Sequence, residues 1–320
     1  MNLLILGGTQ FVGRHVVEAA LARGHAVSTF TRGNNPLPGT ESLIGDRQAG
    51  DYRALEGRTW DAVIDVNAYV PRVVRQAATA IQTRHYTFIS TISVYQASPE
   101  PGIHENSPLQ TLENPDTEAI TGETYGGLKV LCEQAAQELY PACLVVRPHI
   151  VVGPHDPTDR FTYWPRRFAQ QDRVLVPGRP ESAVQYIDAR DQADFIVAAV
   201  EGSLTGVFNS AAPTTTWGDL VAACGGQDKA VWAEEGWLLE QSVTPWADLP
   251  LWIPTGSEGH GLLGVDSSRA LAAGLRVRPL EQTVRELLAW DSARGAELKT
   301  GLSAEREQEL LRAYASRSTA

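Results

Sequence analysis

The chain has 320 residues, of which 43% are hydrophobic and 20% are charged, and its formal net charge at pH 7 is −11. This length predicts about two domains, or one large α/β unit with an appendage. The negative balance argues against nucleic-acid binding, which needs a basic face, and the sequence shows neither a membrane-spanning apolar run nor a secretory signal. We therefore expect a cytoplasmic protein that binds neither nucleic acid nor a membrane. We also expect no metal, because Cys132, Cys143 and Cys224 lack ligand spacing.

The N-terminal stretch joins an apolar run to a helix through a glycine turn. Residues 3–6 are four consecutive apolar residues, a pattern typical of a strand buried on both faces of a parallel sheet. Gly7, Gly8 and Gly13 follow, and residues 12–21 carry apolar side chains at helical spacing. A strand, a glycine turn and a helix form the opening of a dinucleotide-binding unit, in which the helix N-terminus attracts a pyrophosphate. The alternative is a tight turn that binds nothing.

The following elements alternate between strands and helices. We expect strands at 26–30, 42–44, 61–66, 86–90 and 143–146, and helices at 72–82, 122–139, 194–200 and 280–290. This alternation predicts an α/β fold with a doubly wound parallel sheet. Beyond Gly153 the pattern loosens, and tryptophans lie among Pro and Gly, as in a smaller irregular lobe over a cleft. We expect a nucleotide-binding domain at 1–155, with further sheet elements at about 183–210, and a substrate-binding lobe at 156–182 and 211–320.

Tyr125 and Lys129 form the strongest chemical signal in the sequence. Residues four apart on a helix lie on one face. An ammonium group beside a phenol favours the phenolate, so we expect Lys129 to lower the pKa of Tyr125. Tyr125 would then act as a general acid/base at a carbonyl or alcohol. The alternative is a helical tyrosine beside a solvated lysine.

These motifs resemble those of an atypical branch of the extended short-chain dehydrogenase/reductases, the NAD(P)-dependent epimerase/dehydratase-like proteins. The resemblance rests on the glycine turn at 7–13, on residues 90–95 (Ser-Thr-Ile-Ser-Val-Tyr), on the Tyr125/Lys129 pair and on Arg147-Pro148. It implies a Rossmann fold, an NAD(P) cofactor and the catalytic residues Tyr125, Lys129 and Thr91, with Thr91 hydrogen-bonded to the substrate oxygen. The expected cofactor-binding residues are Gly7, Gly8, Thr9, Gln10, Phe11, Val12, Gly13, Arg32, Asp46, Arg47, Val66, Asn67, Ala68, Lys129 and Pro148.

Four departures from the family pattern bear on cofactor and substrate. Gln10 replaces the middle glycine of the turn, as in atypical branches. Arg32 lies where an acidic residue would hold an NAD ribose; a guanidinium suits a 2′-phosphate, so we favour NADP over NAD, with a solvated arginine as the alternative. Residues 92–93 (Ile-Ser) replace the acidic pair of dehydratases, which argues against dehydration. Val184 replaces an arginine that holds a substrate diphosphate in the family. The simpler inference is a substrate other than a nucleotide-diphosphate sugar, and the alternative is that an arginine nearby in sequence (Arg160, Arg166, Arg167 or Arg179) substitutes for it.

The loop after the sixth strand is the expected substrate-binding segment. Ligands of open α/β sheets lie beyond the carboxyl ends of the strands, where this loop begins. Its candidate residues are His149, His155, Arg160 and Tyr163. The tryptophans are expected to form the core of the lobe, with an aromatic wall around an apolar substrate as the alternative.

The leading hypothesis is an NAD(P)-dependent oxidoreductase that transfers a hydride to or from a small carbonyl or alcohol substrate. The first alternative is an NAD(P)-dependent sugar epimerase, which would oxidise and re-reduce one centre. The second is a non-catalytic cofactor-binding regulator or an RNA-associated protein. The resemblance also implies a homodimer formed through the helices at about 72–82 and 122–139.

Overall fold

A seven-stranded sheet forms the base of the computed structural model, which describes residues 1–317. The strand order is β11-β6-β5-β4-β1-β2-β3, and each neighbouring pair is parallel. The predicted fold class, a doubly wound parallel α/β sheet, is confirmed. The strands are β1 (Asn2–Leu6), β2 (Ala26–Thr31), β3 (Glu41–Ile44), β4 (Thr59–Asp65), β5 (Gln82–Ile89), β6 (Cys143–Pro148) and β11 (Gly206–Ser210).

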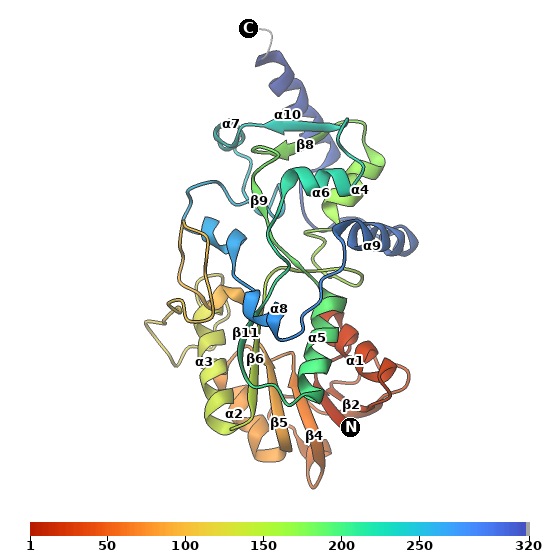
Figure 1. The fold of residues 1–320 in the computed structure, drawn as a ribbon, viewed down its shortest axis with the longest axis vertical. Helices are drawn as coiled ribbons and strands as arrows, with labels where there is room; N and C mark the ends of the chain where they lie inside the picture. Colours follow the sequence, from red (N-terminus) through yellow and green to blue (C-terminus); the bar gives the residue numbers. More distant parts are fainter. Residues whose placement is uncertain (318–320) are drawn as a thin grey trace.

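Helices cover both faces of this sheet (Figure 1). On one face α1 (Phe11–Ala22) packs against α5 (Ala189–Glu201), and on the other α2 (Pro71–Ala80) packs against α3 (Tyr125–Leu139). The four apolar residues of β1 are fully buried, with Leu3 and Ile5 in one core and Leu4 and Leu6 in the other. Burial on both faces explains why β1 is a continuous apolar run and not an alternating one.

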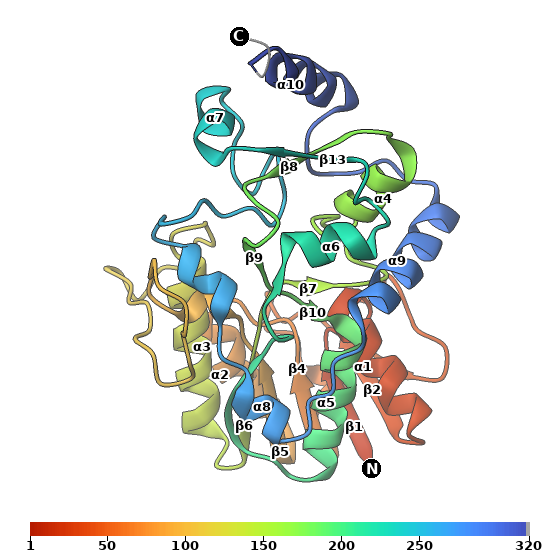
Figure 2. The same ribbon diagram turned by 45° about the horizontal axis from the view of Figure 1, so that its top comes forward.

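A second region of the chain lies over one end of the sheet (Figure 2). Its helices are α4 (Tyr163–Gln170), α6 (Trp217–Ala223), α7 (Glu235–Glu240), α9 (Leu280–Arg294) and α10 (Ala304–Arg317). Short strand pairs connect and support them: β7 (Val151–Val152) with β10 (Ile187–Asp188), β9 (Ala183–Val184) with β12 (Thr215–Thr216), and β8 (Val174–Pro177) with β13 (Ala230–Ala233).

Tryptophans form much of the core of this second region. Trp164, Trp217, Trp237 and Trp252 are all at least nine-tenths buried in one apolar cluster. Trp164 contacts Trp217 edge to face, with ring centroids 4.6 Å apart. The expectation that these side chains form the core of the lobe is confirmed for these four.

One segment of the C-terminal half returns to the sheet. It contains a short helical turn, His260–Gly264, and helix α8 (Ser268–Ala272), which packs against β11. Ala270 and Leu275 belong to the same apolar core as β1 and α5. Part of the stretch predicted for the substrate lobe therefore packs on the nucleotide-binding sheet, and the domain division by residue number stays a prediction. Two further single turns are Arg53–Leu55 and Ile92–Val94.

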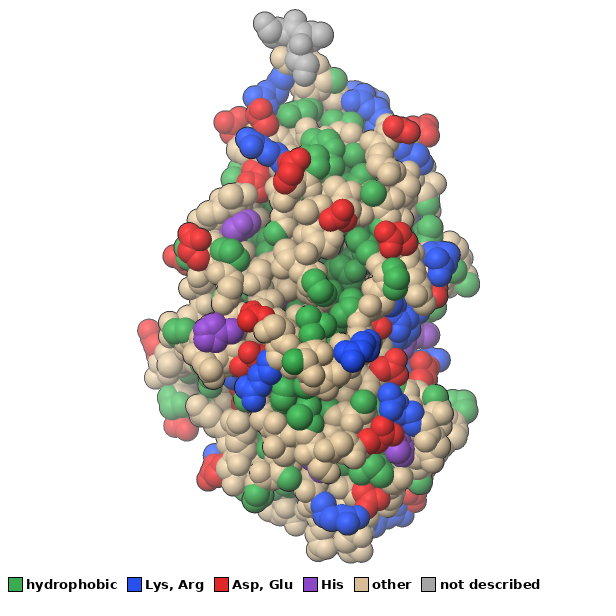
Figure 3. Space-filling view, in the orientation of Figure 1, with side chains coloured by type: hydrophobic (Ala, Val, Ile, Leu, Met, Phe, Trp, Pro, Cys, Tyr) green, Lys and Arg blue, Asp and Glu red, His purple; other side chains and the backbone are tan. Residues whose placement is uncertain are grey.

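Charges of both signs cover the surface. On the face shown in Figure 3, basic side chains lie singly or in small groups between acidic ones. Within residues 1–317, we find no helix with the length and apolar character needed to cross a bilayer.

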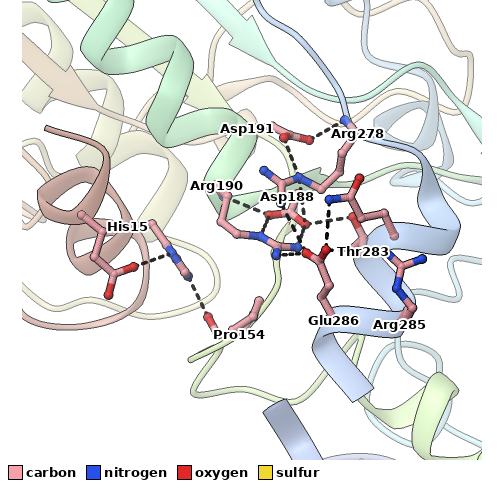
Figure 4. Close-up of polar contacts among 11 residues, drawn as sticks. His15, Pro154, Asp188, Arg190, Asp191, Arg278, Thr283, Arg285 and Glu286 are labelled. Carbon is pink, nitrogen blue, oxygen red and sulfur yellow. Dashed lines mark hydrogen bonds and ion pairs between the residues drawn. The ribbon is translucent and has the colours of Figure 1, made fainter. Parts of the chain in front are cut away.

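A buried polar network fixes the second region to the start of α5 (Figure 4). Asp188 is fully buried and accepts hydrogen bonds from Arg190 and from Thr283 of α9. Arg278 pairs with Asp191, with Nε and Oδ1 2.7 Å apart. Because α5 packs on the sheet, this network sets the position of α9, and with it the second region, over the strand ends.

Candidate functional site

A cavity of about 640 Å³ lies between the strand ends and the second region. Its lower wall comes from the first turn of α1 and the ends of β4, β5 and β6, and its upper wall comes from the loops at 156–160 and 245–254. This is the carboxyl edge of a parallel sheet, where open α/β sheets bind ligands. It is lined by Phe11, Val12, Val66, Tyr69, residues 89–93, Tyr125, Lys129, residues 148–151 and 156–158, Arg160, Pro245, Trp246, residues 252–254 and Leu262.

The glycine turn has the geometry that a dinucleotide requires. Gly7 and Gly8 have φ angles of 100° and 80°, a backbone region that favours glycine. A Cβ atom on Gly13 would lie 2.6 Å from the Cα of Gly8, so only glycine permits this close packing. Gln10 is the N-cap of α1 without a side-chain cap, and the first turn of α1 has no acidic residue. The free N–H groups at this helix end, beside the half-buried Thr9, therefore fit a pyrophosphate.

Lys129 lies beneath the cavity with its ammonium group buried. Its Nζ donates hydrogen bonds to the carbonyl oxygens of Ala68 (2.9 Å) and Ile89 (2.7 Å), which anchors it between β4 and β5. The Nζ also lies 4.1 Å from the centre of the Phe88 ring. Burial lowers the pKa of Lys129 to about 8, so the group is mainly charged at pH 7.

Tyr125 is the first residue of α3 and lines the same cavity as Thr91. Burial raises the pKa of Tyr125, and a hydrogen bond with the Thr91 side chain opposes this shift. The predicted net lowering of this pKa is wrong for the protein alone, because desolvation dominates at the phenol. Thr91 also accepts a hydrogen bond from the Ser93 backbone (3.1 Å), which fixes its hydroxyl at the cavity wall.

Arg47 and Asp65 form a buried ion pair behind the predicted cofactor site. The guanidinium donates to both carboxylate oxygens at 2.7 and 2.6 Å, and the Tyr86 hydroxyl donates to Asp65 at 2.6 Å. The adjacent guanidinium holds the pKa of Asp65 below its usual value against the effect of burial. Both terminal nitrogens of Arg47 are thus engaged by Asp65, which gives this predicted cofactor residue a structural role.

The other predicted cofactor residues differ in exposure. Arg32 is exposed after β2 and has no ion pair with any residue in 1–317. Asp46 is half-buried and accepts a hydrogen bond from the Gln48 backbone (2.9 Å), as a turn residue does. Val66 and Pro148 line the cavity, whereas Asn67 and Ala68 lie beside it in the same segment as Val66.

His149 lines the cavity, yet both ring nitrogens are engaged by the backbone. Its Nδ1 accepts from the Ile150 N–H (2.8 Å), and its Nε2 therefore donates to the Leu262 carbonyl (2.7 Å). Burial lowers its pKa to about 4, so His149 is neutral at physiological pH. It can shape the cavity wall, but it has no free nitrogen for proton transfer.

Arg160 points to the cavity, whereas its predicted partners His155 and Tyr163 do not line it in the described structure. His155 lies between the rings of His15 and Trp290, with centroids 5.9 and 5.3 Å away. Tyr163 is fully buried in the tryptophan core. Tyr163 is the first residue of α4 and packs into that core, whereas His155, with a φ of 70°, packs against α1 and α9.

Sequence reasoning missed several wall residues. Tyr69 follows β4 and contacts Tyr125, with ring centroids 6.3 Å apart. Tyr69 comes three residues after Val66, which follows a strand predicted to end at the cofactor site, and this position could have predicted that Tyr69 lines the cavity. Residues 245–254 and Leu262 carry no motif, so no sequence signal placed them over the cavity. Among residues 1–317 no group of three or more His, Cys, Asp or Glu side chains is arranged to hold a metal.

Fold and site together define a dinucleotide-binding α/β protein whose cavity carries a tyrosine/lysine pair. Residues 49–209 match the family model described as the NAD dependent epimerase/dehydratase family, and the chain belongs to this family. The resemblance drawn from the motifs is therefore confirmed.

Two curated relatives and one solved structure illustrate the range of this similarity. The chloroplast stem-loop binding protein of 41 kDa b of Arabidopsis thaliana is 24% identical over 245 residues, 70% of this chain and 62% of the relative. Sterol demethylase protein B of Methylococcus capsulatus is 27% identical over 178 residues, 49% of this chain and 53% of the relative. The matches thus span less than two thirds of either relative. UDP-glucuronic acid 4-epimerase from Bacillus cereus in complex with NAD superposes with a TM-score of 0.67 at 16% identity, covering 93% of this chain and 99% of that one.

Proposed function

We propose that the chain is an NAD(P)-dependent enzyme that transfers a hydride to or from the carbon of a secondary alcohol or carbonyl group. The observation that carries this proposal is that Tyr125 and Thr91 line the same cavity as the first turn of α1, with Lys129 buried beneath them. Family membership supports the same class of chemistry.

The residues around the cavity suit the parts of the cofactor. The glycine turn at 7–13 would hold the pyrophosphate, and Val66 and Pro148 would lie along the nicotinamide half. Lys129 uses two of its three N–H donors on backbone carbonyls, which leaves one for a ribose hydroxyl. When bound, the nicotinamide ring supplies a hydride donor or acceptor.

Proton transfer at the substrate oxygen would fall to Tyr125. In reduction the phenol donates its proton to the carbonyl oxygen, and in oxidation the phenolate takes it back. The Thr91 hydroxyl would orient that oxygen, since it is fixed at the wall by the Ser93 backbone. A hydroxyl and a phenol at one oxygen position are enough for this chemistry, and the neutral, fully engaged His149 takes no part in it.

We favour NADP over NAD because of Arg32. Its exposed guanidinium has no ionic partner among the described residues, follows β2 and is free to meet a 2′-phosphate. A carboxylate at this position would instead repel that phosphate.

Epimerisation is the second candidate function, and the family model together with the likeness to a 4-epimerase structure favours it. An epimerase would use the same residues but return the hydride to the same carbon. Val184, which is buried in this structure, takes the place expected for a diphosphate-binding arginine and argues against a nucleotide-sugar substrate. Net consumption of reduced cofactor separates the two functions, because an epimerase shows none.

RNA association is a third possibility, which the name of the chloroplast relative keeps open. The net charge of −11 argues against it, since RNA binding needs a basic face, and the one face drawn in Figure 3 carries charges of both signs. An electrophoretic mobility shift with RNA that weakens as the salt concentration rises would favour RNA association over the enzyme proposal. The homodimer and the cytoplasmic location stay predictions.

The experiment that tests the proposal begins with mass spectrometry of the nucleotide that copurifies with the protein. A panel of alcohols and carbonyl compounds is then screened at the absorbance of the reduced cofactor, and products are checked for inverted stereochemistry. We expect copurified or added NADP(H) to bind and at least one substrate to change the absorbance. A protein that binds no nicotinamide nucleotide would contradict the proposal.

A further inference from the structure

Two cations line the cavity, and Arg160 is the one whose charged group is not held by backbone carbonyls. Of the basic residues in its lining, Lys129 is held by two backbone carbonyls, whereas Arg160 forms no ion pair with any residue in 1–317. Its Nε donates to the Thr158 hydroxyl (3.1 Å), and its guanidinium carbon lies 5.6 Å from the centre of the Trp246 ring. These contacts hold the side chain against the wall and leave both terminal nitrogens free to bind.

The acidic residue of the cavity lining, Asp156, forms no ion pair with Arg160. Asp156 is 2% exposed, and its Oδ1 accepts from the Thr158 backbone (2.8 Å) and hydroxyl (2.7 Å). Its Oδ2 is buried without a partner, and burial raises its pKa, which favours the neutral acid. Asp156 is also the one acidic residue of the cavity lining. The site therefore holds a cation that forms no ion pair with the one carboxyl group of the cavity lining.

The remaining upper wall is apolar. Trp246, Trp252, Ile253, Pro254 and Leu262 face the cavity, and Trp252 donates its indole N–H to Glu235 outside the lining (2.9 Å). Such a wall buries the carbon skeleton of a ligand and offers few partners to hydroxyl groups. A nucleotide sugar would leave many polar groups without partners there, and each buried unpaired group costs binding free energy.

We propose that Arg160 binds a carboxylate on an otherwise apolar hydroxy- or oxo-acid, and that this class of molecule is the substrate. The proposal rests on the function proposed above, because the alcohol or ketone of the acid would be the group that Tyr125 serves. A guanidinium binds a carboxylate through two parallel hydrogen bonds, which fits the two free nitrogens. The net charge of −11 repels an anionic ligand, and a local cation such as Arg160 offsets this repulsion at the site.

The position of Arg160 relative to Tyr125 supports one binding chamber for both groups. Burial is the largest influence on the pKa of Tyr125, and Arg160 is among the charges that lower it. Arg160 also lowers the pKa of His149 on the adjoining wall. Tyr125 and Arg160 also line the same cavity of about 640 Å³, so one small molecule bound there can contact both side chains.

Binding of matched acids and esters tests the proposal. The probes are a linear, a monocyclic and a polycyclic hydroxy acid (3-hydroxydodecanoate, a hydroxycyclohexane carboxylate and a hydroxysteroid carboxylate), each beside its methyl ester, with UDP-glucose as a separate arm. Dissociation constants are read from tryptophan fluorescence and calorimetry, with and without NADP⁺. We expect at least one acid to bind about tenfold to a hundredfold more tightly than its ester.

Arg160→Gln should remove this preference, and Arg160→Lys should restore part of it. Arg173→Gln is the matched control, because Arg173 is exposed before β8, lies outside the cavity lining and carries the same charge. Thermal unfolding checks that each variant is folded. Equal binding of every acid and its ester, an unchanged preference in Arg160→Gln, or tighter binding of UDP-glucose than of any acid would overturn the proposal.

The readout separates this proposal from the proposed function. Because binding is measured instead of turnover, an acid preference that depends on Arg160 would stand even if no nicotinamide nucleotide binds. Conversely, NADP(H)-linked turnover of neutral alcohols alone, without any acid preference, would refute the carboxylate inference and leave the oxidoreductase function intact.

Discussion

The lower and upper walls of the cavity, here called the floor and the roof, are built in different ways. The floor consists of strand ends whose residues are fixed by sheet hydrogen bonds and by buried pairs such as Arg47 and Asp65. The roof consists of loops at 156–160 and 245–254, held by the tryptophan core and by the polar network of Figure 4. The floor carries the groups of the expected cofactor chemistry, and the roof carries the groups that would recognise a substrate.

This difference indicates that the floor determines cofactor binding and the roof determines substrate binding. A nicotinamide cofactor requires one arrangement of the strand ends, whereas loops over a sheet can change without altering the fold. The comparison predicts that floor variants change cofactor binding or stability, and that roof variants such as those at Arg160 change substrate binding alone.

The largest expected effect is on stability, at the buried pair of the floor. Asp65→Ala should lower the free energy of unfolding by about 3–5 kcal/mol, because it leaves the Arg47 guanidinium charged, buried and unpaired. Glu138→Ala removes an exposed pair with Arg75 and should cost less than about 1 kcal/mol. Chemical denaturation of both variants measures this contrast. Equal losses would mean that the floor is not held by its buried charges.

The next effect concerns the glycine turn. Gly13→Ala places a Cβ 2.6 Å from the Gly8 backbone, so the turn must open, and NADP(H) affinity should fall on the order of a hundredfold. Gly236→Ala is the matched control in α7 of the roof region, where a Cβ meets no atom within 4 Å. Calorimetric titration compares the two. Full affinity in Gly13→Ala would place the cofactor elsewhere.

A pH dependence should follow from Lys129. Its pKa of about 8 means that the folded protein loses the ammonium proton as pH rises through 8. If that ammonium holds a cofactor ribose, NADP(H) affinity should fall above pH 8. Lys129→Met should bind NADP(H) more weakly than the unchanged protein, and its affinity should not depend on pH in this range.

The free energy of unfolding should change in the opposite direction. The unfolded chain keeps the Lys129 proton to about pH 10.4, whereas the folded chain loses it near pH 8. The cost of burying the charge is therefore fully present below pH 8 and disappears as pH rises from 8 to about 10.4, so stability should increase over this range.

The smallest effect separates the two cofactors. Arg32→Ala should weaken NADPH binding by about fivefold to tenfold, since the guanidinium is exposed and screened, and should leave NADH binding unchanged. Dissociation constants for both nucleotides test this. A loss shared equally by NADPH and NADH would remove the basis for preferring NADP.

The difference between the floor and the roof also explains which features the sequence predicts. The sheet, its order of helices and the Tyr125/Lys129 pair follow from periodicity and spacing, which are local signals. The pairing of Arg47 with Asp65 does not, because it joins two residues 18 positions apart, one in the loop after β3 and one at the end of β4. The positions of His155 and Tyr163 depend on distant parts of the chain for the same reason: His155 packs against His15 and Trp290, and Tyr163 packs in the tryptophan core. The tryptophan loop over the cavity has no period at all, so only the folded lobe reveals it.

The central claim is that Tyr125 serves as the acid/base of a nicotinamide-dependent reaction in this cavity. The most direct measurement is single-turnover hydride transfer in Tyr125→Phe beside the cofactor dissociation constant of the same variant. The account predicts a rate reduced by about a hundredfold or more, with cofactor affinity nearly unchanged. An unchanged rate would contradict it.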